Sequence, residues 1–173
     1  MNAISLFGGL STLVAQMGPN VDVGVDPSTG LVGGAVGAFL TTLIVGGLML
    51  AIVPDYTGRM RELVLDEPVG AFVYGIVTLL ALVVVTVLLA ITIIGLLVAV
   101  PLALVAYVVW AVGAAIAYLA IGDRLVGHDD GWLKPLLVGA AINGVLTLTG
   151  IGGLIAFGIG AIGFGAVLRN LLA

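Results

Sequence analysis

LLAITIIGLLVAVP, residues 88–101, lies near the middle of a run without charged residues that extends from Pro68 to Gly122. At about 1.5 Å per residue, a straight helix of that length would be roughly 80 Å long, whereas the hydrocarbon core of a bilayer is about 30 Å thick. The chain must therefore reverse direction within this run.

The reversal is predicted at Thr92-Ile93-Ile94-Gly95. A glycine adopts positive φ easily, and a threonine hydroxyl can hydrogen-bond a carbonyl group that a helix end leaves free. Pro101 follows about one turn into the next helix, where the N–H that proline lacks would stay unpaired anyway. The same spacing recurs at Thr147-Leu148-Thr149-Gly150. It predicts a second turn and two related hairpins, with chance similarity between apolar segments as the alternative.

Composition indicates an integral membrane protein. Hydrophobic residues make up 62% and charged residues 8% of the 173 residues, and the mean hydropathy is +1.37. Soluble domains carry roughly 25% charged residues. The net charge of −4 argues against nucleic acid as a partner, because phosphate binding needs clustered Lys and Arg. The scarcity of basic residues, together with abundant Val, Ala and Gly, is typical of a halophilic archaeon.

Charged residues, Gly and Pro divide the apolar sequence into segments. We predict an all-α integral membrane protein with about five transmembrane helices, in which two hairpins follow one N-terminal span. The fourth segment is short, so a re-entrant hairpin of segments four and five is the alternative. Residues 1–29 are predicted to form a short interfacial helix and a loop, and residues 30–173 the transmembrane helical domain. The spans are placed near 30–53, 69–93, 96–121, 133–149 and 151–171.

The basic residues predict the orientation in the membrane. Five spans put every one of them on the same side, and the opposite side carries no Lys or Arg. The positive-inside rule then predicts a multi-pass protein of the cell membrane with its N-terminus outside and its C-terminus cytoplasmic. The residues are Arg59, Arg61, Arg124, Lys134 and Arg169.

A series of motifs runs from Pro54 to Leu172. It comprises a Pro, an Arg-containing amphipathic linker, an acidic pair followed by Pro-x-Gly, the ITIIG turn with Pro101, a Gly-Asp-Arg loop and a glycine-rich last helix. This order resembles a membrane domain found after bactofilin repeats in polymer-forming proteins of archaea and bacteria. The resemblance covers about two thirds of the chain and implies a membrane anchor or scaffold. The bactofilin β-helix, with its short repeating strands, is not present in this sequence.

The sequence offers little catalytic chemistry. Lys134 and Arg169 lie at the ends of predicted spans, and no Asp, Glu, Lys, Arg or His lies in the interior of one, although proton relays and ion-coupled carriers usually place such groups there. No nucleophile–base pair or carboxylate pair is arranged for catalysis. His128-Asp129-Asp130 has metal-ligand character, but adjacent residues rarely converge on one ion without distant partners, so we expect a solvated loop. We expect no enzyme activity, cofactor or metal.

Small residues predict where helices pack. Gly33 and Gly37 share one face of the first span, and Gly158 lies in the glycine-rich last span. Small residues let backbones approach closely in lipid, so these faces are predicted to pack within the subunit or in a homo-oligomer. Asn143 is expected to hydrogen-bond another helix, with the lining of a small path as the alternative.

The linker PDYTGRMRELVLDEP, residues 54–68, is amphipathic. As a short helix on the cytoplasmic surface, it would bury Met60 and Val64 in the membrane and hold Arg59 and Arg61 toward lipid phosphates. A plain connector is the alternative.

These features favour a non-enzymatic membrane scaffold or anchor that self-associates. Its expected partners are membrane lipids and a cytoplasmic or membrane protein held through the cytoplasmic loops. The alternative is a small channel or facilitator for a small or apolar solute that uses Thr, Asn143 and glycine-lined space.

Overall fold

The computed structural model of the protein describes residues 27–149 and 151–172. The chain divides into two compact units, Met1–Gly30 and Leu31–Ala173, and the second unit contains the packed helices. The predicted interfacial helix lies outside the described residues.

The described residues are helical apart from short connections, and none of them forms a strand. Four helices are long and apolar enough to span a membrane, which confirms the predicted all-α, multi-pass membrane class. The fourth predicted segment is also helical but shorter. In chain order the helices are α2 (Pro27–Ile52), α3 (Pro54–Asp66), α4 (Pro68–Ala90), α5 (Ile93–Val126), α6 (Leu133–Leu148) and α7 (Gly152–Leu172).

Two prolines make sharp corners on both sides of α3. Each corner is a single non-helical residue, Val53 or Glu67, with φ near −130° and a proline directly after it. A proline disfavours helical geometry in the preceding residue, yet suits the first position of a helix because it has no N–H to leave unpaired. Pro54 and Pro68 therefore end one helix and begin the next without a loop.

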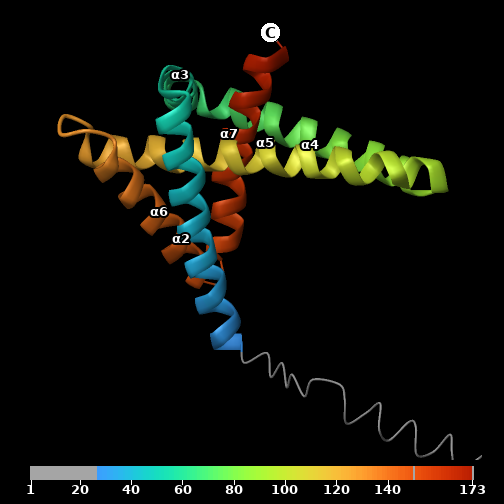
Figure 1. Ribbon diagram of the computed structural model, residues 1–173, viewed down its shortest axis with the longest axis horizontal. Helices are drawn as coiled ribbons and strands as arrows, with labels where there is room; N and C mark the ends of the chain where they lie inside the picture. The colour runs from blue at the N-terminus through green and yellow to red at the C-terminus, as the bar shows by residue number, and fades with distance from the viewer. Residues whose placement is uncertain (1–26, 150, 173) are drawn as a thin grey trace, which may run out of the picture. The chain divides into compact units, whose positions relative to one another are not determined.

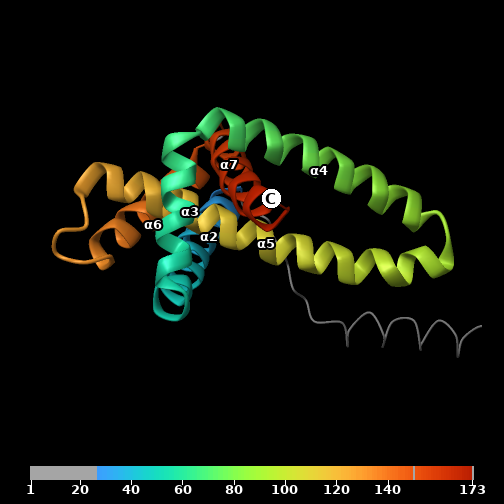
Figure 2. The ribbon, with the colours of Figure 1, turned by 90° about the horizontal axis from the view of Figure 1, so that it is seen from above.

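The hairpin of α4 and α5 is the longest feature of the second unit, and α7 crosses between its two helices near their base (Figures 1 and 2). On the other side, α6 packs against the C-terminal half of α5. The short helix α3 packs against both α5 and α7. The core thus gathers where α3, α4, α5 and α7 meet.

Glycines allow backbones to touch at these crossings. A Cβ atom added to Gly75 of α4 would overlap the carbonyl oxygen of Ala161 in α7, and one added to Gly165 of α7 would overlap that of Ala71 in α4. On each helix the two residues are four positions apart, so they lie on one face. Small residues on both partners let the two backbones approach closely.

The crossing of α5 and α6 repeats this arrangement. A Cβ atom at Gly122 would overlap the carbonyl oxygen of Pro135, and one at Gly139 would overlap that of Tyr118. Each helix again contributes two residues four positions apart. At these two crossings, close backbone contact therefore follows paired i, i+4 positions on each helix.

The predicted turn at the tip of the long hairpin is present. Thr92 is the N-cap of α5, and its Oγ1 accepts a hydrogen bond of 2.9 Å from the Gly95 amide. The prediction of positive φ at Gly95 is wrong, since Gly127 and Gly131 are the described residues with positive φ. Glycine is needed at 95 because a Cβ atom would overlap the Leu89 carbonyl oxygen.

The start of α5 also changes the role of Pro101. Because α5 begins at Ile93, Pro101 lies two turns into the helix rather than one. The Leu97 carbonyl oxygen consequently loses the i+4 N–H that a helix interior normally supplies. The proposed fit of proline to the first helical turn is therefore wrong.

The second turn is displaced by two residues from the predicted motif. Thr147 lies inside α6, where its hydroxyl donates to the Asn143 carbonyl oxygen at 2.8 Å. Thr149 occupies the place of Thr92, and its hydroxyl donates to Leu146 as that of Thr92 does to Leu89. Gly152 corresponds to Gly95, because a Cβ atom there would overlap the Leu146 carbonyl oxygen. Gly150 lies outside the described residues.

Candidate functional site

The linker helix α3 packs onto the protein with its apolar face. Thr57, Met60 and Val64 are buried, and the last two belong to the core formed with α5 and α7. The Thr57 hydroxyl points to the carbonyl oxygens of Met49 and Val53, at 3.1 and 3.0 Å, where α2 ends. The prediction that this apolar face lies in lipid is wrong, because neighbouring helices cover it.

Helix α5 continues past its apolar stretch and brings a carboxylate into the core. The predicted span ends at 121, but α5 ends at Val126, followed by Gly127 with φ of 68°. Asp123 lies one and two helical turns after the buried Leu119 and Ile116, and is itself only 4% exposed. The interpretation of residues 122–126 as loop is therefore wrong.

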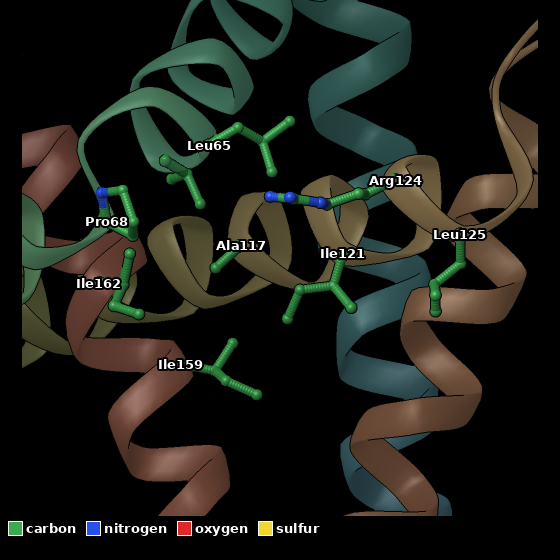
Figure 3. Close-up of a pocket in the computed structure, with 9 residues that line it drawn as sticks. Leu65, Pro68, Ala117, Ile121, Arg124, Leu125, Ile159 and Ile162 are labelled. Atoms are coloured by element: carbon green, nitrogen blue, oxygen red, sulfur yellow. The ribbon is translucent and has the colours of Figure 1, made fainter.

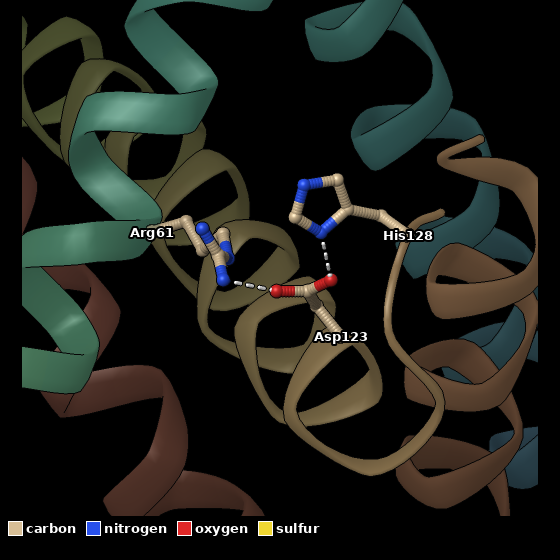
Figure 4. Close-up of polar contacts among 3 residues, drawn as sticks. All are labelled: Arg61, Asp123 and His128. Atoms are coloured by element: carbon tan, nitrogen blue, oxygen red, sulfur yellow. Dashed lines mark hydrogen bonds and ion pairs between the residues drawn. The ribbon is translucent and has the colours of Figure 1, made fainter. Parts of the chain in front are cut away.

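Two side chains from different elements hold this carboxylate (Figure 4). Arg61 of α3 forms an ion pair with Oδ2 of Asp123. His128, just beyond α5, lies with its Nδ1 at 2.6 Å from Oδ1. A buried carboxylate needs such partners, because its desolvation would otherwise cost several kcal/mol.

An indole ring supports the two partners from the start of α6. Trp132 stacks on His128, with ring centroids 4.4 Å apart and planes 7° from parallel. The guanidinium carbon of Arg61 lies 5.9 Å from the centroid of Trp132. The buried Nε of Arg61 has no hydrogen-bond partner among the described residues, so the indole contact adds to the ion pair in holding the guanidinium.

These contacts correct two expectations. Arg61 was predicted to face lipid phosphates, but it pairs with Asp123. His128 was expected in a solvated loop, but its ring bridges Asp123 and Trp132. Arg59 is exposed and forms no ion pair with any described residue.

The contacts of Asp123 form a fastening between two parts of the fold. Arg61, Asp123 and His128 tie the helix between α2 and α4 to the connection between α5 and α6. Within the described residues, no group of three or more His, Cys, Asp or Glu could hold a metal ion. This fastening holds α3 through an ion pair whose carboxylate is buried.

The structure places the other candidate residues in two different settings. Asn143 donates to the Ala38 carbonyl oxygen at 3.3 Å and to the Thr42 hydroxyl at 2.8 Å, linking α6 to α2. Gly33, Gly37 and Gly158 have no described atom within 4 Å of an added Cβ.

Sequence reasoning missed Asp123, although a signal was present. Continuing the helical period from Ile116 by seven residues, or from Leu119 by four, reaches Asp123 on the same face. Treating the first charged residue after an apolar run as the end of the helix concealed this position.

The fold and this fastening define a multi-pass α-helical membrane protein with a buried ion pair. A family model described as "Domain of unknown function (DUF8173)" matches residues 2–173, and the chain therefore belongs to the DUF8173 family. No curated protein and no solved structure matches it.

Proposed function

We propose that this protein is a non-enzymatic membrane scaffold or anchor that self-associates through α2 and holds a protein partner through its cytoplasmic loops. The resemblance to membrane domains of bactofilin-containing proteins supports the anchoring role. The distribution of basic residues supports an external N-terminus and a cytoplasmic C-terminus.

One face of α2 carries this proposal. Gly33, Gly37, Leu40, Ile44 and Leu48 follow one another at spacings of three or four residues, and all are exposed. The opposite face is already used, since α6 contacts it through Asn143. The free face combines glycines for close approach with aliphatic side chains for packing, as helix interfaces in lipid do.

Glycine use elsewhere in the chain supports this interpretation. At Gly75 and Gly165, glycine is needed because another backbone touches the helix. At Gly33 and Gly37, no described atom occupies the corresponding space. A second copy of α2 would fill it and supply the reason for having glycine there.

The exposed side of α3 is the surface we assign to a partner protein. Arg59, Glu62 and Asp66 are exposed there, while the other side of the helix is buried. The fastening at Asp123 keeps this surface in a fixed position on the protein. A rigid surface binds with less loss of conformational entropy than a mobile loop.

The experiment is a mass measurement of the full chain in mild detergent and in native-like lipid. We expect a dimer or larger assembly for the unmodified chain, and a monomer for Gly37→Leu that still inserts into membranes. The bulky side chain would hold the two α2 backbones apart.

The matched control is Gly153→Leu, which changes an exposed glycine of α7 that also has no described neighbour within 4 Å. It should assemble like the unmodified chain. A stable monomer for the unmodified chain in both environments, or an unchanged assembly for Gly37→Leu, would overturn the α2 interface.

A further inference from the structure

A groove lies beside the C-terminal half of α5, separate from the free face of α2. Its volume is about 380 Å³, within the range of small-molecule sites. Ile121 of α5 and Ile159 and Ile162 of α7 line it, and Leu65 and Pro68 close it where α3 meets α4 (Figure 3).

Arg124 is the charged side chain in this otherwise apolar lining. Its guanidinium reaches across the groove toward the side of Leu65 (Figure 3). Arg124 forms no ion pair with any described residue, and the neighbouring Asp123 is engaged by Arg61. The cation therefore remains available to a ligand.

The other lysine and arginine residues do not combine an unpaired charge with a place in the groove lining. Lys134 pairs with Asp130, and Arg169 pairs with Glu67 beside Pro68. Arg59 is also unpaired within the described part of the chain, but it does not line the groove. Arg124 alone among the groove's lining residues thus joins a free charge to an apolar surface.

We propose that this groove binds an anionic membrane phospholipid, with an acyl chain along Ile121, Ile159 and Ile162 and the phosphate on Arg124. A guanidinium can donate two parallel hydrogen bonds to phosphate oxygens. A free inorganic phosphate would leave the aliphatic walls unused. A zwitterionic lipid carries its own cation, which offsets the attraction to Arg124.

The site does not depend on self-association, because its lining comes from one copy of the chain. It also differs from the predicted lipid contact of the linker, since Arg61 is occupied by Asp123. Arg61 of α3 and Arg124 near the end of α5 therefore have separate roles: Arg61 pairs with Asp123, and Arg124 lines the groove.

The test is native mass spectrometry of the full chain released from mild detergent after incubation with phosphatidylglycerol or with phosphatidylcholine of identical acyl chains. We expect phosphatidylglycerol to be retained about tenfold more, as one charge-assisted hydrogen-bonded contact would give. Arg124→Gln should lower its retention to the phosphatidylcholine level, while Arg59→Gln should leave it unchanged.

Ile159→Trp provides a second variant, because it fills the groove and leaves the charge in place; it should also abolish the preference. Inorganic phosphate should not displace the bound lipid. Equal retention of both lipids, full retention by Arg124→Gln, equal loss in Arg59→Gln, or displacement by inorganic phosphate would overturn the proposal. Thermal unfolding without added lipid identifies any variant that has lost its fold. If either Arg124→Gln or Ile159→Trp is unfolded, the lipid preference of the other variant tests the proposal.

Discussion

The base and the tip of the α4–α5 hairpin are both made mostly of apolar residues but differ in packing. At the base, Ala71 and Ala117 are 2% and 1% exposed, and α7 lies against both helices. Toward the tip, Val84 and Leu97 are 57% and 79% exposed. In lipid, burial of apolar surface gives no drive for helices to associate, so contacts depend on shape. Small residues at the base supply that shape, and branched residues at the tip do not.

The largest expected effect comes from destroying the base. Gly75→Leu would place a side chain where the α7 backbone lies, so we expect little folded protein and a fall in stability of about 3 kcal/mol or more. Yield of monodisperse protein and thermal unfolding in mild detergent measure this. Gly153→Leu serves as control, because the added side chain enters open space. Unchanged stability of Gly75→Leu would show that α4 and α7 do not pack through this face.

The same contrast explains what the sequence could predict. Hydropathy and turn residues placed α2, α4, α6 and α7 within a few residues of their observed ends, because both signals are local. They could not distinguish glycines that touch another backbone, such as Gly165, from glycines that do not, such as Gly37. That distinction depends on which helices cross, and crossings join residues far apart in the chain.

The candidate site was predicted only in part for a related reason. The sequence predicts the amphipathic helix 54–68, since its pattern is local, but it indicates lipid as the partner of the apolar face. Asp123 and Trp132 follow the tip of the long hairpin in the sequence, far from Arg61. Only the fold brings them next to Arg61. A pattern along one helix shows that a face is apolar, but it does not show whether protein or lipid covers that face.

The second effect in size concerns the fastening beside the base. Arg61→Gln would leave the buried Asp123 without its cation, and we expect a loss of about 3 kcal/mol. The exposed Arg59→Gln should change stability by less than about 0.5 kcal/mol. Adding Asp123→Asn to Arg61→Gln should recover part of the loss, because the uncompensated charge is then gone. Equal stability of both arginine variants in thermal unfolding would show that the ion pair between Arg61 and Asp123 does not stabilise the fold.

The smallest effect is expected at the tip. Thr92→Ala removes the hydroxyl that accepts from the Gly95 amide, and loss of an N-cap typically costs about 1 kcal/mol. Since the tip contacts no other helix of the described core, this cost should appear as local fraying of α5 rather than as a change in global unfolding. Hydrogen exchange of the Gly95 and Leu96 amides in detergent should accelerate about fivefold, while thermal unfolding stays unchanged. Thr92→Ser keeps the acceptor and should retain normal exchange. A large fall in thermal stability for Thr92→Ala would instead mean that the tip and base unfold as one unit, and the contrast between them would not extend to their energetics.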